Sequence, residues 1–325
     1  MARTPAPGAQ VSGTVLRGDV TARDFADALD ALGGLNPGRA VILVALAPPA
    51  PVSAAVVDLV VDELLARGAD SVTVGAGRGV SAHALAAGLT GHTARGRTYD
   101  VIDVHDSLGT ADLPVGSVLH GRPVSLAWSG ATTRVVLARS VTDLAEGYGG
   151  ALATLATIAA EVPGADPAEV AADLADHLAP HLCIIDATIS SDGPDGRHQL
   201  RPADTGALVV GLDPLVVDAT LAGLHGIDRA VSRPVAELLR RRGPPTGEVS
   251  GDLTPFDAFE RPHPLIRDAW RRAEQAPGIG RVLAAARAGR GRGAELGQGA
   301  AGAVAHHDHR RGVEPVGRAV GPHPL

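Results

Sequence analysis

The stretch AVILVALAPPAPVSAAVVDLVVDELLARGADSVTV, residues 40–74, decides the fold class of this chain. Ala40–Leu46 is a continuous apolar run, which predicts a buried strand. A helix is predicted after Ser53, because apolar residues recur every four positions from Val56 to Leu64. Ser71–Val74 then predicts a second strand. Strand, helix and strand in this order form a βαβ unit, whose crossover implies that the two strands are parallel.

Similar patterns in the rest of the chain predict further strands and helices. Strands are predicted at Asp100–Val104, Val124–Trp128, Arg134–Arg139, Cys183–Thr188 and Ala207–Leu212. Helices are predicted after an N-cap at Thr21 and at Tyr148–Glu161, Asp166–Leu178, Ser232–Gly243 and Leu265–Gln275. The sequence therefore predicts an α/β fold with a mostly parallel sheet flanked by helices.

Composition divides the chain into three segments. Residues 1–36 are predicted to form an N-terminal segment with one helix, and residues 37–283 to form the α/β core. Residues 284–325 are rich in Gly and Arg and lack apolar periodicity, which predicts a disordered, low-complexity tail. The tail contains His306, His307 and His309, for which a solvated tract is a better explanation than a metal site, because no structured surroundings are evident.

The overall composition argues against several classes of function. A formal charge of -7, with two Trp, two Tyr and three Phe, argues against nucleic acid as the main partner. One cysteine, Cys183, cannot form an internal disulfide or hold an iron–sulfur cluster, so a cytoplasmic location is expected. The longest apolar run, Val52–Leu65, is interrupted by Asp58, Asp62 and Glu63, so neither a membrane span nor secretion is expected.

All 29 Lys and Arg residues are arginine. A chain without lysine has no Schiff-base nucleophile, no lysine general base and no phosphate-binding P-loop lysine. A glycine-rich stretch with Gly75, Gly77 and Gly79 follows a predicted strand, but its spacing is G-x-G-x-G and not the G-x-G-x-x-G of dinucleotide-binding loops. We interpret it as a tight turn between strand and helix.

The segment CIIDATISSDGPDGRHQ, residues 183–199, contains the strongest candidate site. An apolar strand runs into Asp186, and the sequence DGPDG, here called the acidic loop, places Asp192 and Asp195 among glycines and a proline. The next predicted strand ends at Asp213. In a parallel sheet these four carboxylates would converge at the carboxyl ends of the strands, where they could bind a divalent metal or exchange a proton.

Each of these residues also has a structural interpretation. Asp192 and Asp195 could accept hydrogen bonds from turn amides, and Asp213 before Pro214 is a typical helix N-cap. His225 lies downstream, on the helix that follows this strand. A histidine in such a place is more often a partly buried structural residue than a general base. The sequence leaves both interpretations open.

Three segments in order resemble the family of domain of unknown function 362: IIDATISSDGPDG at residues 184–196, ALVVGLDPLVVDATLAGLHG at 207–226 and GEVSGD at 247–252. The resemblance spans roughly Pro37 to Pro262. Family members carry Lys-Asn where this chain has Ala153 and Thr154, and many append a cysteine-rich ferredoxin segment that this chain lacks. The resemblance implies a fold and the position of a site more than a reaction, and it implies no redox role here.

Two functions are consistent with these observations. The first is an isomerase or lyase acting on a small carboxylate-bearing metabolite, with Asp186, Asp192 and Asp195 as catalytic residues, Asp186 and Asp192 as possible ligands of a divalent metal, and Arg139, His225 and Asp213 as substrate-binding residues. Arg139 would clamp the carboxylate. The second is a non-catalytic binding or accessory protein that keeps the fold and lacks the polar centre. The sequence does not define the oligomeric state.

Overall fold

The computed structural model describes residues 11–46, 51–77, 80–159, 165–193, 195–196, 201–256 and 263–275. The chain divides into two compact units, residues 1–271 and 272–325. The elements described below lie in the first unit, except for the last residues of the final helix. The predicted tail and its three histidines fall outside the described residues.

One large sheet organises the first unit. Among the described residues its strands follow the order β11-β1-β10-β9-β7-β2-β3-β4, and β8 pairs with β7. Their bounds are β1 Val11–Arg17, β2 Arg39–Val44, β3 Ser71–Ala76, β4 Asp100–Asp103, β7 Thr133–Asp143, β8 Gly147–Gly149, β9 Leu182–Ser191, β10 Pro202–Gly211 and β11 Glu248–Gly251. A separate two-stranded sheet pairs β5, Leu108–Thr110, with β6, Pro123–Ser125.

The strands from β9 to β4 are parallel to one another, as the βαβ pattern predicts. The other part of the sheet is mixed, because β10 is antiparallel to both β9 and β1, whereas β11 is parallel to β1. The fold is therefore α/β with a mostly parallel sheet flanked by helices, in agreement with the sequence. None of the helices in the described part of the chain combines the length and the apolar character that crossing a bilayer requires.

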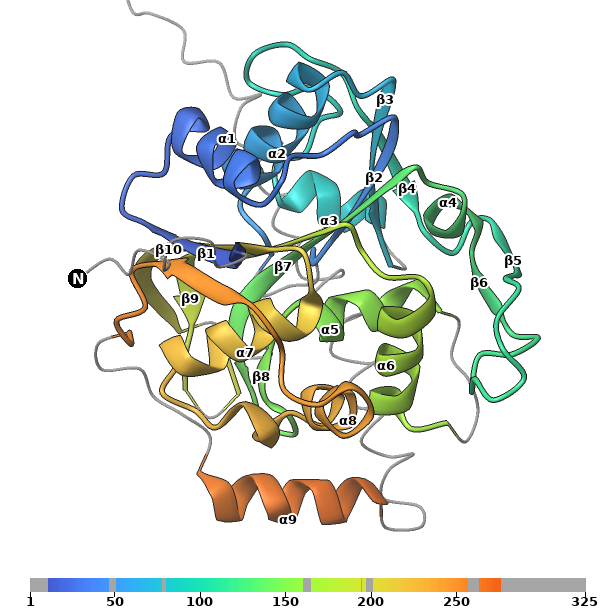
Figure 1. Ribbon diagram of the computed structural model, residues 1–325, viewed down its shortest axis with the longest axis vertical. Helices are drawn as coiled ribbons and strands as arrows, with labels where there is room; N and C mark the ends of the chain where they lie inside the picture. The colour runs from blue at the N-terminus through green and yellow to red at the C-terminus, as the bar shows by residue number, and fades with distance from the viewer. Residues whose placement is uncertain are drawn as a thin grey trace, which may run out of the picture. The chain divides into compact units, whose positions relative to one another are not determined.

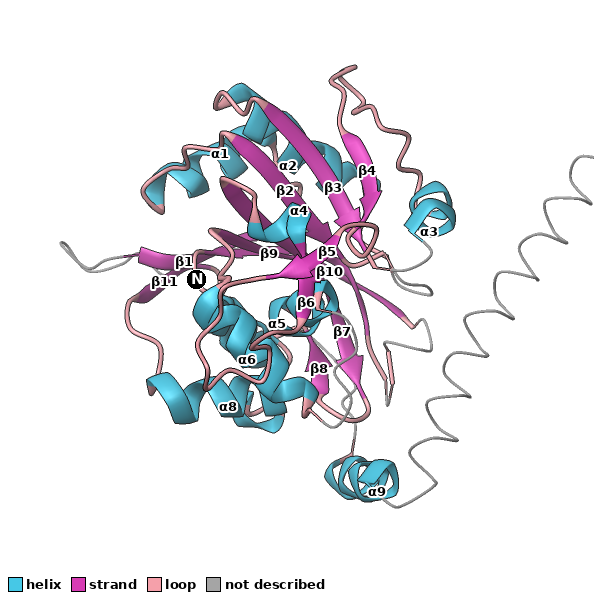
Figure 2. Ribbon diagram, turned by 90° about the vertical axis from the view of Figure 1, so that its right-hand side faces the viewer, coloured by secondary structure: helices cyan, strands magenta, loops and turns pink. Residues whose placement is uncertain are grey.

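Helices cover both faces of the sheet (Figures 1 and 2). Helices α1 and α2 pack on one face, against apolar side chains such as Ile42, Leu137 and Ile184. Helices α5 to α8 pack on the other face, against side chains such as Val136 and Ile185. The helices are α1 Ala22–Ala31, α2 Ala54–Ala66, α3 Val80–Ala86, α4 Leu126–Ser129, α5 Ala151–Leu155, α6 Pro167–His177, α7 Pro214–Leu224, α8 Arg233–Arg242 and α9 Pro264–Gln275.

Capping residues set several helix ends where the sequence predicts them. Thr21 and Asp24 form a reciprocal capping box at the start of α1. Asp166 and Asp213 cap α6 and α7, each by accepting a hydrogen bond from a backbone N–H two residues later. Gly243 ends α8 with φ of 77°, a left-handed conformation that glycine adopts without strain.

Two predicted elements are wrong. Val124–Trp128 is not one strand, because the Ser125 hydroxyl accepts the Trp128 backbone N–H and starts the short helix α4. Tyr148–Glu161 is not one helix: β8 ends at Gly149, and α5 passes into a 3-10 turn at Ala156–Ile158. The N-terminal segment also contains a strand, β1, that the sequence interpretation missed, and this strand is part of the large sheet.

Candidate functional site

The candidate site begins with Arg139 on β7 and Asp186 on β9, which are paired neighbours in the parallel sheet. Side chains alternate between the two faces of a strand, and Leu137 and Ile184, two residues earlier on each strand, belong to the core under α1 and α2. Arg139 and Asp186 therefore share that face, near the carboxyl ends of the parallel strands. Ligands commonly bind at this edge of an open α/β sheet.

Asp186 is completely buried, and its carboxylate receives four hydrogen bonds. Oδ2 accepts the backbone N–H of Ser53 at 2.9 Å and Nη1 of Arg139 at 3.2 Å. Oδ1 accepts the backbone N–H and the hydroxyl of Thr188, at 3.0 and 2.6 Å. A carboxylate offers about four lone-pair positions, so the structure leaves Asp186 none for a metal ion or a substrate proton. Its local role is to hold Arg139 and the start of α2.

The guanidinium of Arg139 uses only some of its hydrogen-bond donors in this arrangement. Its side chain is 10% exposed, and Nη1 donates to Asp186. The buried Nε finds no acceptor among the described residues. The Nε and Nη2 hydrogens point to the same side of a guanidinium, which is the edge that binds a carboxylate with two parallel hydrogen bonds. This edge of Arg139 is the part of the site that a ligand could complete.

The acidic loop has partners other than Asp186. The backbone N–H of Asp192 donates to the carbonyl of Arg201 at 3.0 Å, and the two side chains form an ion pair at 3.8 Å. The backbone N–H of Gly196 donates to the Thr142 hydroxyl at 2.8 Å, which fixes the loop to the end of β7. Within the described part of the chain, no contact joins Asp186 to Asp192 or to Asp195.

The expected convergence is wrong for Asp213. Because β10 is antiparallel to β9, Gly211 at the end of β10 pairs with Cys183 at the start of β9. Asp213 therefore lies at the opposite end of the sheet from Asp186. Its carboxylate caps α7 through the backbone N–H of Leu215 and lies 3.6 Å from Nη1 of Arg242. The N-cap interpretation is confirmed.

His225 also lies away from Arg139. It follows α7, and its Nε2 lies 2.9 Å from the hydroxyl of Ser140. Ser140 is adjacent to Arg139 on β7 and so faces the other side of the sheet. Both Ser140 and His225 are buried, and burial lowers the pKa of His225 to about 3, which keeps its ring neutral. The expected pairing of His225 with Arg139 around one substrate is wrong, because the sheet separates them.

Ser140 and His225 belong to a buried chain of hydroxyl groups. Ser190 Oγ lies 2.8 Å from Ser140 Oγ and 2.7 Å from Thr205 Oγ1. Thr205 in turn donates to the carbonyl of Ala187 at 2.6 Å. The chain links β7, β9 and β10 under α7. Ser140 is therefore a satisfied core residue and not an accessible nucleophile.

One pair at the same sheet edge was not selected from the sequence. Asp103 ends β4, and its Oδ1 accepts the backbone N–H of His105 at 2.8 Å and lies 3.3 Å from the ring nitrogen Nδ1. Both side chains are 17% exposed. A Cβ on Gly77, just after β3, would lie 3.9 Å from Cε1 of His105, so the imidazole lies beside the ends of both strands. The sequence feature that could have identified this pair is an acidic residue at a strand end with a histidine two positions later.

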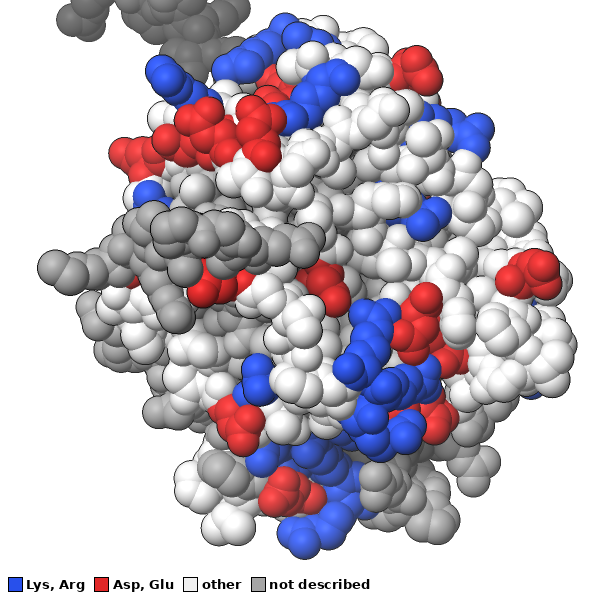
Figure 3. Space-filling model, in the orientation of Figure 1, with Lys and Arg blue, Asp and Glu red and all other residues white. Residues whose placement is uncertain are grey.

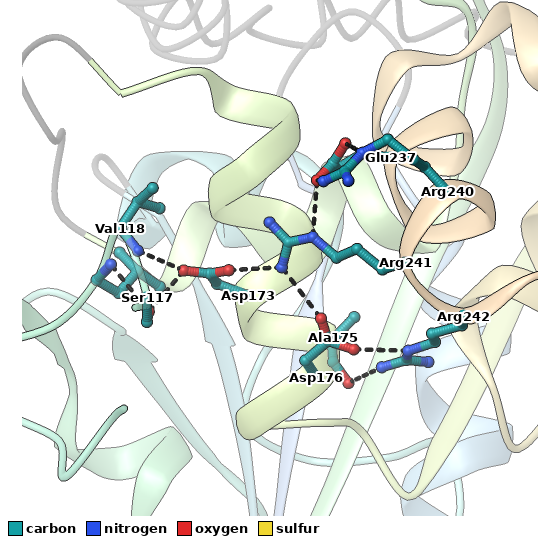
Figure 4. A network of polar contacts seen from close by, with 10 residues as sticks. Ser117, Val118, Asp173, Ala175, Asp176, Glu237, Arg240, Arg241 and Arg242 are labelled. Atoms are coloured by element: carbon teal, nitrogen blue, oxygen red, sulfur yellow. Dashed lines mark hydrogen bonds and ion pairs between the residues drawn. The ribbon is translucent and has the colours of Figure 1, made fainter. Parts of the chain in front are cut away.

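A larger polar network lies on the opposite face of the sheet, between α6 and α8 (Figure 4). Arg241 binds Asp173, Asp176 and Glu237, and Asp173 also accepts hydrogen bonds from Ser117 and Val118. On the face shown in Figure 3, basic side chains gather around α8 with acidic ones among them. This charge is neutralised internally. Within the described residues, no three His, Cys, Asp or Glu side chains are arranged to hold a metal ion.

The family model described as "Domain of unknown function (DUF362)" matches residues 42–223, more than half of the chain. Among solved structures, the chain is similar to the lactate racemase apoprotein from Thermoanaerobacterium thermosaccharolyticum, with 12% identity, 63% of this chain and 55% of that one covered, and a TM-score of 0.39. A protein from Thermotoga maritima matches with 12% identity over 69% of this chain and 60% of its own, with a TM-score of 0.35. The chain thus spans less than two thirds of either structure. No curated protein matches it.

Proposed function

The chain belongs to the family of domain of unknown function 362, and from the geometry of its own residues we propose that it is a cytoplasmic protein that binds a small carboxylate-bearing metabolite through Arg139. The observation that carries this proposal is the Nε and Nη2 edge of Arg139, which has no acceptor among the described residues although Asp186 already holds the guanidinium in place. A fixed guanidinium loses little freedom when it binds a carboxylate with two hydrogen bonds.

Asp186 is a positioning residue in this proposal. Its four hydrogen bonds occupy both oxygens, so it orients Arg139 and neutralises part of its charge without contacting the ligand. This geometry does not favour Asp186 as a metal ligand or a catalytic base. The proposed role of the acidic loop as a metal site therefore depends on Asp192 and Asp195, without Asp186.

A second candidate function is acid–base catalysis at the same edge of the sheet, as in an isomerase or a lyase. The observation that favours it is the Asp103 and His105 pair, in which the carboxylate lies 3.3 Å from Nδ1 of the imidazole. This nitrogen forms no hydrogen bond among the described residues, so reorientation of the ring toward Asp103 would be needed for His105 to act as a general base. β4 lies three strands from β7, which is roughly 14 Å at the usual strand spacing. His105 would therefore act only on a substrate that extends along the edge. The binding function needs no such extension and is the primary proposal.

Calorimetric titration with acetate, succinate and benzoate, each beside its neutral amide, tests the binding function. We expect the parent protein to bind at least one carboxylate and not the matching amide. Arg139→Lys keeps the charge opposite Asp186 but loses the planar fork, so binding should weaken by about tenfold or more.

Arg241→Lys is the matched control, because Arg241 is a partly buried arginine whose described contacts are all internal. It should leave carboxylate binding unchanged. Equal binding by the parent and by Arg139→Lys would refute the role of Arg139. Binding that is lost only in His105→Gln would move the site to β4 and favour the catalytic candidate.

A further inference from the structure

A pocket of about 420 Å³ lies beside α7, away from Arg139. Apolar side chains of α7 and β11 form much of its wall, among them Val216, Ala219 and Val249. Val216 and Val249 approach each other over β1, where a Cβ on Gly13 would lie 3.2 Å from Cγ1 of Val216 and 3.7 Å from Cγ2 of Val249. The absence of a side chain at Gly13 is what lets the helix and the edge strand close over β1 and leave the pocket between them.

Two features keep this pocket open and give it one polar side. A Cβ on Gly223 of α7 would meet nothing within 4 Å, so the helix presents bare backbone to the pocket. Arg229 lies at the wall with an exposed side chain, and its guanidinium has no acceptor among the described residues. Glu248 also lines the pocket, but it already has an interaction partner. The unpartnered charge is therefore positive.

We propose that this pocket is a second small-molecule site, for an amphipathic carboxylate whose apolar body lies between α7 and β11 and whose charge pairs with Arg229. The volume falls within the usual range for ligand pockets, roughly 300–1,000 Å³. The wall combines apolar side chains with polar groups, as the two ends of an amphipathic ligand require. The site is separate from the one at Arg139. Helix α7 packs on the face of the sheet opposite to Arg139, so loss of either site leaves the other in place.

The test uses the full chain, octanoate as the ligand probe, and the fluorescent probe anilinonaphthalene sulfonate as the reporter. We expect the fluorescent probe to bind and octanoate to displace it, with octanamide several-fold weaker. Gly223→Leu should fill the pocket and weaken binding of both probes by about tenfold or more. Gly116→Leu is the matched control, because Gly116 is an exposed glycine whose Cβ would also meet nothing within 4 Å.

Arg229→Gln tests the contribution of the Arg229 charge separately from that of the pocket's shape. It should keep binding of octanamide and remove most of the preference for octanoate, whereas Arg122→Gln, at another exposed arginine, should change neither. Arg139→Lys should also leave octanoate binding unchanged, so failure of the proposed function and failure of this second site give different results. The proposal is overturned if octanoate does not displace the fluorescent probe, or if Gly223→Leu binds both probes as the parent does.

Discussion

Two arginine–aspartate pairs with buried carboxylates lie on opposite faces of this sheet, and they differ in what the arginine does with its other donors. Arg241 donates through Nη1 to Asp173 at 2.6 Å and through Nε to Glu237 at 2.7 Å. Arg139 donates through Nη1 to Asp186, and its Nε meets no acceptor in the described part of the chain. The aspartates are alike, since both are buried and both receive backbone and hydroxyl hydrogen bonds.

We interpret this difference as one between a structural contact at Arg241 and a proposed binding site at Arg139. Burial raises the pKa of Asp173, but hydrogen bonds from Ser117, Arg241 and Val118 outweigh it and lower the pKa. That carboxylate is thus held ionised by groups that all belong to the fold. An arginine that leaves its bidentate edge unused in a desolvated place lacks such an explanation, because buried donors are normally paired. The Arg139 pair is therefore the one in which we propose that a ligand supplies the missing acceptor.

The largest effect should come from Asp186→Ala, which tests whether the Arg139 pair is as desolvated as its burial indicates. The change leaves the Arg139 charge, two backbone N–H groups and a hydroxyl without their acceptor. Breaking a buried ion pair by removing one partner lowers stability by about 3–5 kcal/mol, and we expect a loss in that range in urea unfolding. Asp186→Asn should lose less stability, because the amide oxygen can still accept some of the four hydrogen bonds that the carboxylate receives. A loss below about 1 kcal/mol for Asp186→Ala would show that water reaches the pair.

Asp173→Ala should have the next largest effect and should also loosen a distant segment. Its carboxylate accepts the Ser117 hydroxyl at 2.5 Å and the Val118 backbone N–H at 2.6 Å, so it fixes the connection between β5 and β6 to α6. Losing these acceptors in a buried place lowers stability by about 1–3 kcal/mol. Hydrogen exchange should then increase at Val118. Asp176→Ala, at a more exposed partner of Arg241, is the control and should leave that exchange unchanged.

Asp218 sharpens the comparison, because it is a buried aspartate with no guanidinium partner among the described residues. Its carboxylate accepts the backbone N–H groups of Ala151 and Leu152, at 2.6 and 3.1 Å, and burial raises its pKa from 3.8 to about 7. The folded state therefore binds this proton more tightly than the unfolded state does. As pH rises from about 4 to about 7, the contribution of Asp218 to stability falls by up to about 1.4 kcal/mol per pH unit, and it is constant above that window.

The pH dependence of stability is best measured as a difference between the parent and Asp218→Asn, because His225 changes stability with pH in the opposite direction to Asp218. Its pKa is lowered to about 3, so its contribution to stability increases with pH up to its unfolded value of 6.5. Subtracting the unfolding free energies of the parent from those of Asp218→Asn removes the His225 contribution. The difference should shift in favour of the variant from about pH 4 to about pH 7 and then level off. A difference that does not vary with pH would mean that Asp218 is ionised throughout, as Asp173 is.

The sequence predicted the parallel half of the fold well and the mixed half poorly. Long apolar runs such as Ala40–Leu46 are buried on both faces and carry a strong signal, whereas most residues of β1 and β11 are half-buried. The direction of β10 did not follow from the predicted strands, because Thr188 and Ala207 leave a connection long enough for a parallel crossover. In the structure β9 and β10 extend to Ser191 and Pro202, so residues 192–201 are fewer than the dozen or more that a crossover needs. The strands are therefore antiparallel, and Asp213 lies at the far end of the sheet.

The candidate site was predicted in part. The sequence selected Arg139 and Asp186 individually, but it placed Asp186 with the acidic loop and Arg139 with the substrate. Their pairing depends on β7 and β9 being neighbours, although α5 and α6 lie between them in the chain. Nothing in the local pattern around either residue encodes that adjacency. The hydrogen bonds that Ser53 and Thr188 donate to the Asp186 carboxylate were not predicted, for the same reason.

The smallest effect is expected for Asp192→Asn, and it tests whether the acidic loop resembles either pair. The Asp192 side chain is 13% exposed, but its partner Arg201 is 52% exposed and 3.8 Å away. Exposed ion pairs contribute about 0–1 kcal/mol, and the backbone hydrogen bonds of Asp192 and Gly196 remain in the variant. We therefore expect the unfolding free energy to fall by less than about 1 kcal/mol, and a double-mutant cycle with Arg201→Gln should give a coupling energy no larger than that.

Adding Mn²⁺ to the same unfolding experiments decides whether Asp192 does more than pair with Arg201. A metal that binds the folded state raises its stability by mass action, in proportion to the logarithm of the free metal concentration. If the acidic loop holds such an ion, Mn²⁺ should stabilise the parent, and Asp192→Asn should lose that gain because an amide is a weaker ligand than a carboxylate. If parent and variant respond to Mn²⁺ alike, Asp192 does not hold the ion, and Arg139 is the remaining proposed ligand-binding residue at this edge of the sheet.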